Sequence, residues 1–168
     1  MPSNIQSAVA VSVPVHLESG CKRISKKANY IYQKKFLVSL REKIHAKGNQ
    51  FPDIIDVSLL DNIKSLYEFD DVYTSKLHGF KDAKDYYTIN SSLQFLGGID
   101  IPTLIINALD DPFLPDACYP YKEVENNPYL SMLTPDYGGH VGFVMPGKAH
   151  YWDEVVISQF ISEHSLLA

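Results

Sequence analysis

The sequence has little that would need an oxidising compartment or a membrane. Cys21 and Cys118 are its only cysteines, and we predict that both are reduced and that neither binds a metal. No run of eighteen apolar residues occurs, and the first twenty residues lack a basic segment followed by a long apolar core. Neither a membrane span nor a signal peptide is therefore expected, and a cytoplasmic location is the default.

Several binding motifs are also missing. No pair of histidines has metal-ligand spacing with a carboxylate, and no glycine-rich loop opens a helix, because Gly97 and Gly98 precede a predicted strand. The 11 tyrosines are not interleaved with a basic sheet face, as a base-stacking platform would need. We expect no metal, no cofactor and no nucleic-acid partner.

Three short apolar runs predict the strands of an α/β fold: 8–13, 103–106 and 129–133. The middle run is apolar or β-branched without alternation, which is typical of a parallel strand that is covered on both faces. Helical patterns fill the stretch between the first two runs and predict an insertion there. With 168 residues and 45% hydrophobic content, we predict a single domain over 1–168.

The helical patterns specify which faces should be buried. The segment 29–47 is expected to end at Gly48 and to bury one stripe: Phe36, Leu37, Leu40 and Ile44. Asp56 is expected to cap a short helix, and Ser65 with Glu68 has capping-box spacing. The closing helix, 151–167, is expected to direct five side chains inward: Val155, Val156, Phe160, Ile161 and Leu167.

Positive charge is concentrated in one segment. Residues 22–47 hold nine Lys or Arg and one acid, Glu42, a net charge of +8, whereas the whole chain has −5. One interpretation is a solvated helix face. The other is a surface for an anionic partner such as a phospholipid membrane.

Candidate catalytic groups follow the second and third strands. The central strand runs into Asp110-Asp111-Pro112, and His140 follows the third strand after Gly138 and Gly139. Side chains that follow neighbouring parallel strands meet at one edge of the sheet, and the glycines allow an exposed turn there. An acid followed by a histidine in this order matches the last two members of a hydrolase triad.

Together these strings resemble one branch of a known superfamily. AVAVSVPVHLE, LHGFKDAKDYY, IPTLIINALDDPFLP and GGHVGF, in this order, are similar to the C-terminal half of the YheT-like α/β-hydrolases. The resemblance implies a partial α/β-hydrolase sheet of about three mostly parallel strands, with a helical cap inserted over roughly residues 15–95. It also implies a serine carboxylesterase or lipid acyl hydrolase that acts on a small ester or lipid substrate without a cofactor.

The resemblance assigns roles to six residues. Asp111 is the expected triad acid, since the acid of the family directly precedes the proline turn, and His140 is the expected base. Asp110 would brace the turn, although the two acids could have the opposite roles. Gly138, Gly139 and Phe143 would shape the loop that carries His140.

The nucleophile is missing from the pattern. No serine lies within Gly-x-Ser-x-Gly, and the loop that completes the oxyanion hole in the family has no counterpart. The chain is therefore expected to be inactive alone. It would be either one part of a hydrolase that pairs with a separate N-terminal half, or a non-catalytic remnant or binding module.

The first strand also suggests an interaction. It is apolar apart from Ser12, and the strand that would precede it in the family is absent. An unpaired apolar edge is a template for another chain, so we expect a homodimer in which the first strands meet edge to edge or the N-terminal segments swap.

Overall fold

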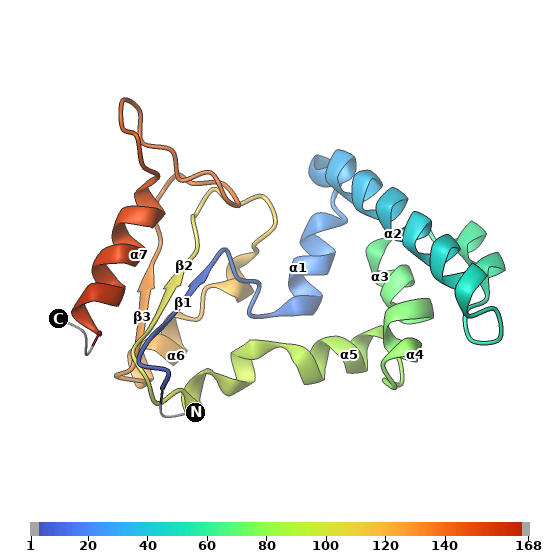
Figure 1. The fold of residues 1–168 in the computed structure, drawn as a ribbon, viewed down its shortest axis with the longest axis horizontal. Coiled ribbons are helices and arrows are strands. Elements are labelled where there is room, and N and C mark those ends of the chain that lie inside the picture. The colour runs from blue at the N-terminus through green and yellow to red at the C-terminus, as the bar shows by residue number, and fades with distance from the viewer. Residues whose placement is uncertain (1–3, 166–168) are drawn as a thin grey trace. The chain divides into compact units, whose positions relative to one another are not determined.

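The computed structural model describes residues 4–165. It divides into two compact units, which we call the sheet unit, Met1–His16 with Ser91–Ala168, and the helical unit, Leu17–Asn90. The helical unit interrupts the sheet unit between its first and second strands (Figure 1). The assignment of the whole chain to one domain stays a prediction.

The sheet unit contains a three-stranded parallel sheet. Its strands β1 (Ala8–Val11), β2 (Thr103–Ile106) and β3 (Leu130–Leu133) lie in the order β1-β2-β3, with β2 in the middle. All four residues of β2 are buried, as the uniform apolar run predicted, because the strand has a neighbour on each side and cover on each face. The predicted α/β class and parallel sheet are confirmed.

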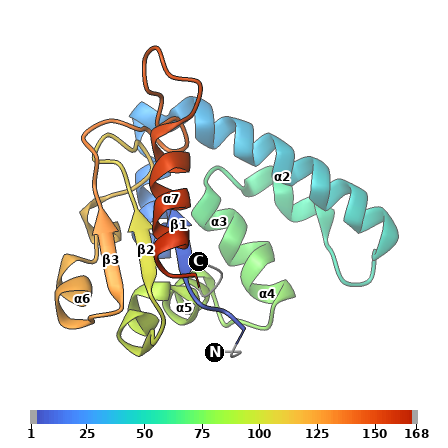
Figure 2. The same ribbon diagram turned by 60° about the vertical axis from the view of Figure 1, so that its left-hand side comes forward.

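Helices cover both faces of this sheet. Helix α7 (Trp152–Glu163) packs on the face that presents Leu104 and Ile106 (Figure 2). The opposite face of the sheet presents Ile105. Three elements cover this face: α6 (Tyr121–Asn126) and the 3-10 helices Ser92–Gly98 and Asp116–Cys118.

The predicted inner face of α7 is partly wrong. Val155 and Ile161 are each 48% exposed, and the residues that pack on the sheet are Trp152, Val156, Ile157 and Phe160. The sequence of this helix is apolar on several sides, so its periodicity does not select one face. Leu167 lies outside the described residues.

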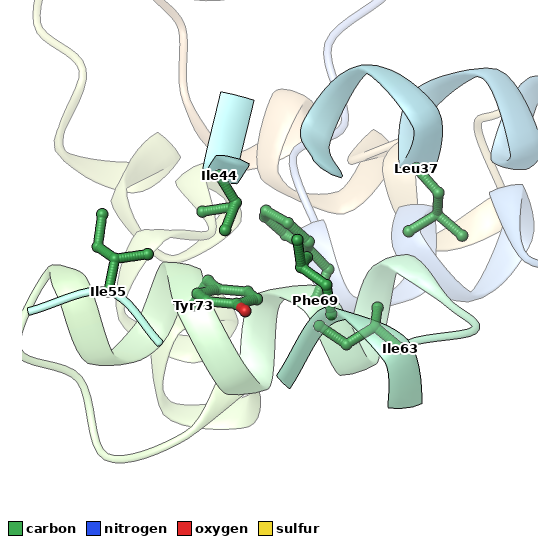
Figure 3. Packing of buried hydrophobic residues seen from close by; sticks show 7 residues of the cluster. Leu37, Ile44, Ile55, Ile63, Phe69 and Tyr73 are labelled. Atoms are coloured by element: carbon green, nitrogen blue, oxygen red, sulfur yellow. The ribbon is translucent and has the colours of Figure 1, made fainter. Parts of the chain in front are cut away.

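The helical unit consists of short helices around one long one. Its elements are α1 (Leu17–Ile24), α2 (Tyr30–Gln50), α3 (Leu66–Phe69), α4 (Ser75–Leu77) and α5 (Ala83–Asn90), with 3-10 helices at Lys27–Asn29 and Val57–Asn62 and a π-helical turn at Asp70–Thr74. The cap at Asp56 and the capping box of Ser65 and Glu68 are confirmed. Figure 3 shows the main core of this unit, where Leu37 and Ile44 of α2 meet Ile55, Ile63, Phe69 and Tyr73.

Two predictions about α2 are wrong. The helix does not end at Gly48 but continues to Gln50. Gly48 is instead a site of close packing, because a Cβ atom there would lie 2.2 Å from a methyl carbon of Val57. Phe36 is 39% exposed, whereas Leu37 and Ile44 of the expected stripe are buried.

The remaining sequence predictions that the structure tests concern thiols and membranes. Cys21 and Cys118 are both free and buried. No helix within the described residues has the length and apolar character needed to cross a lipid bilayer.

The predicted homodimer can be tested at β1. Among the described residues, β1 pairs with β2 alone. The N–H groups of Ala8 and Ser12 bond toward β2, so by alternation those of Val9 and Val11 point to the open edge. We expect a dimer at micromolar concentration by light scattering, and Val9→Pro should abolish it, because proline removes one outward N–H. A monomeric wild-type chain would contradict the prediction.

Candidate active site

The end of β2 presents two carboxylates that have different surroundings. The backbone turns immediately after the strand, where Asp111 N–H donates to Ala108 C=O at 3.2 Å. The side chain of Asp111 is fully buried, and its Oδ1 accepts from Phe113 N–H at 2.8 Å. One oxygen of Asp111 therefore fixes the turn, which leaves the other oxygen for a second partner.

Asp110 holds the loop that follows β3. Its Oδ1 accepts from the backbone N–H groups of Gly138 and Gly139, at 2.9 Å and 2.7 Å. Asp110 therefore braces the loop that carries His140, whereas the sequence predicted that it braces the turn directly after β2. It ties the end of β2 to the two residues that directly precede His140.

Asp111 and His140 lie next to each other at this edge of the sheet. Asp111 Oδ2 is 2.8 Å from His140 Nδ1. The imidazole is 37% exposed, whereas the carboxylate has no exposure. Since a carboxylate only accepts, Nδ1 carries the proton in this contact and Nε2 is left as the basic nitrogen of a partly open ring.

The His140 loop needs its glycines for space and for conformation. A Cβ on Gly138 would lie 2.6 Å from the ring of Phe143 and 2.9 Å from Cβ of Ala108, and Gly139 has a φ of +55°. Phe143 is 2% exposed and stacks on Trp152 with ring centroids 6.1 Å apart. Phe143 thus anchors the loop in the core of the sheet unit.

Ser12 is a second tether that the sequence interpretation did not identify. Its hydroxyl donates to the backbone carbonyl of His140, and it is 5% exposed with a φ of 53°. Non-glycine residues with positive φ are uncommon, and such strain concentrates at functional sites. The signal in the sequence is that Ser12 is the one polar residue in the first apolar run.

Two aromatic residues complete the surroundings. Phe113 meets the His140 ring edge-on, with centroids 4.9 Å apart. The Tyr119 hydroxyl donates to Ala108 C=O at 2.5 Å. Burial, reinforced by the negative charge of Asp111, raises the pKa of Tyr119 to about 12, so this donor stays protonated at neutral pH.

Within residues 4–165, no three His, Cys, Asp or Glu side chains are close enough to hold a metal ion. The arrangement is a positioned base: a buried acid orients an imidazole at the end of a parallel sheet, where ligands bind in open α/β folds. The catalytic roles of Asp111 and His140 stay predictions.

Comparison with known proteins gives relatives over most of the chain. It is 35% identical to the putative esterase YheT of Escherichia coli (strain K12) over 83% of this chain and 42% of that protein. It is 30% identical to phospholipase ABHD3 of Bos taurus over 94% of this chain and 39% of that protein. A third relative, medium-chain fatty acid ethyl ester synthase/esterase 2 of Saccharomyces cerevisiae, is 38% identical over 61% of this chain and 22% of its own length.

The coverage limits what these relatives imply. The chain spans about two fifths of the length of the first two relatives. No family model matches the chain.

Proposed function

Because the chain is a relative of the YheT-like α/β-hydrolases, we propose that it supplies the acid and the base of a serine ester hydrolase. The observation that carries this proposal is the 2.8 Å contact between buried Asp111 and partly exposed His140. A merely structural histidine would not need a buried carboxylate on one nitrogen and an open second nitrogen.

In this proposal His140 Nε2 takes the proton of a serine hydroxyl while the serine oxygen attacks the ester carbonyl. The same proton then goes to the departing alcohol, and an acyl-serine remains. Water repeats the sequence and releases the carboxylic acid. Asp111 keeps Nδ1 protonated and stabilises the imidazolium that forms in each half of the reaction.

The serine must come from a segment outside these residues. No Gly-x-Ser-x-Gly occurs among the 168 residues, so the chain would act together with a nucleophile-bearing half. The names of the relatives support a substrate class, since they include a phospholipase, a monoacylglycerol lipase and a medium-chain fatty acid ethyl ester synthase/esterase. A carboxylic ester with an acyl chain is the substrate that these names share.

Co-expression tests this proposal. The chain is produced with the Gly-x-Ser-x-Gly-bearing N-terminal half of a YheT-like relative, and the purified pair is assayed with p-nitrophenyl esters of short and medium acyl chains. We expect hydrolysis by the pair and none by either half alone, because base and nucleophile are then on different chains. The matched control is the same pair with its nucleophilic serine replaced by alanine.

The alternative is a non-catalytic binding module, which the missing nucleophile motif favours. A pair that co-purifies as a stable complex but hydrolyses no ester would support the module and contradict the enzyme. Hydrolysis that continues after the serine is removed would contradict the triad mechanism.

A further inference from the structure

Helix α2 has apolar side chains on two sides. Leu37 and Ile44 point into the core of the helical unit (Figure 3). Ile31 and Val38 lie one heptad apart on another side of the helix and are 78% and 46% exposed. Core packing accounts for the side that carries Leu37 and Ile44, but it does not account for the apolar residues Ile31 and Val38 on the exposed side.

The exposed side carries positive charge between its apolar residues. Ile31, Lys34, Lys35 and Val38 follow the i, i+3, i+4, i+7 spacing of one helix face, and Tyr30 flanks them with 60% exposure. We call these five residues the outer face of α2. Exposed apolar side chains and lysines on one surface can both contact a membrane interface, where apolar groups enter the headgroup boundary and cations meet anionic lipid.

The surface around the outer face has an excess of positive charge, because Lys34 and Lys35 share it with one acid, Glu42. Lys26 and Lys27 are exposed just before α2 and add positive charge at this end of the helix. Across the part of the chain that the structure describes, none of these four lysines forms an ion pair. They belong to the segment with net charge +8 in a chain of −5.

From these observations we propose that the outer face of α2 docks the helical unit onto an anionic lipid membrane. Exposed Ile31 and Val38 enter the headgroup boundary, Tyr30 lies at the interface, and the lysines contact lipid phosphates and carboxylates. The proposal does not depend on ester hydrolysis, since it uses no residue of the Asp111–His140 site.

A membrane fits this surface better than a second protein does. A stable protein interface needs roughly 1,000 Å² of buried surface and about twenty residues on each side, which a face of five residues does not provide. A lipid interface has no such minimum, because each cation and each apolar side chain contributes separately. Charge complementarity also selects anionic over neutral lipid.

Vesicle co-sedimentation of the full chain tests the proposal. The probes are phosphatidylcholine vesicles with and without about 30 mol% phosphatidylserine, in low salt and in about 0.5 M salt. We expect binding to the anionic vesicles in low salt, and at least roughly tenfold weaker partitioning in high salt or onto neutral vesicles.

Variants locate the binding surface. Lys34→Gln with Lys35→Gln should weaken partitioning about 25-fold, because each lysine near the surface contributes about fivefold at low salt. Ile31→Ser should weaken it roughly tenfold through lost apolar insertion. The matched controls are Lys84→Gln with Lys122→Gln, which removes the same charge elsewhere, and Ile161→Ser, which removes an exposed isoleucine of α7.

Three results would overturn the proposal. The first is no binding to anionic vesicles, or equal binding to neutral ones. The second is an equal loss of binding in the control variants, which would mean that the outer face of α2 is not the binding surface. The third is a change of oligomeric state in the Lys34→Gln, Lys35→Gln variant by light scattering, which would make a second copy of the chain the occupant.

Discussion

Replacing His140 by alanine in the co-expressed pair is expected to lower kcat/KM for an ester by at least about a thousandfold. The reason is that no other group can take the serine proton at this position. Asp111 is buried behind the imidazole, and its second oxygen is already engaged by Phe113 N–H. The measurement is steady-state hydrolysis of a p-nitrophenyl ester by wild-type and variant pairs at equal complex concentration.

The acids at the end of β2 make this prediction specific. Asp111→Asn should cost nearly as much as His140→Ala, about a thousandfold or more, because an amide can donate to Nδ1 and place the proton on Nε2. Asp110→Asn should cost much less, roughly tenfold, since Asp110 accepts hydrogen bonds from the backbone of Gly138 and Gly139 and not from the imidazole. Equal losses for the two acids would contradict the assignment of Asp111 as the triad acid.

A histidine control separates chemistry from surface effects. The side chain of His150 is 77% exposed, and it lies near the exposed carboxylate of Glu154 on α7. His150→Ala should leave kcat/KM within about twofold of the wild type, in line with other surface changes. A large loss in this variant would show that the assay reports complex stability instead of proton transfer.

The parts of the fold that were predictable are those with a local physical cause. The run Thr103 to Ile106 has no polar alternation because β2 is covered on both faces, and the following acids and proline mark where it leaves the sheet. The capping box depends on two residues that are three positions apart, Ser65 and Glu68. The positions of Asp111 and His140 follow from strand order alone, since both strands end at one edge.

The errors have a common cause, which is that burial depends on partners distant in the sequence. Gly48 is typical of a helix end, but Val57 packs where its side chain would be, and the helix continues. Val155 and Ile161 are as apolar as Val156, yet only Val156 of the three packs on the sheet. No local pattern specifies these long-range contacts.

Asn107 has a structural role that no sequence pattern predicted. It directly follows β2 and is completely buried. Its Oδ1 accepts from Val13 N–H at 3.0 Å, and its Nδ2 donates to Val13 C=O at 3.2 Å and to Cys118 C=O at 2.9 Å. One amide therefore satisfies three backbone groups from two segments that flank the sheet.

Asn107→Ala is expected to lower the free energy of unfolding of the sheet unit by about 3–5 kcal/mol, because each buried group left without a partner costs about 1–3 kcal/mol and a cavity also forms. Urea denaturation followed by the fluorescence of Trp152 measures this directly, since the only tryptophan packs on the sheet. The matched control is Asn126→Ala, which removes one exposed contact to Lys122 C=O and should cost less than about 0.5 kcal/mol.

A second readout shows whether the loss is local to Asn107. Cys118 has no exposure in the folded chain, and its carbonyl is held by the Asn107 amide, whereas Cys21 is buried in the helical unit. In Asn107→Ala, a thiol reagent should label Cys118 faster under native conditions while the rate at Cys21 stays as in the wild type. This contrast follows because local opening lowers protection only where contacts are lost. The prediction would be contradicted if the labelling of Cys118 were unchanged and the free energy of unfolding fell by less than about 1 kcal/mol. Water would then replace the Asn107 amide without cost, and Asn107 would not hold the end of β2 against its neighbours.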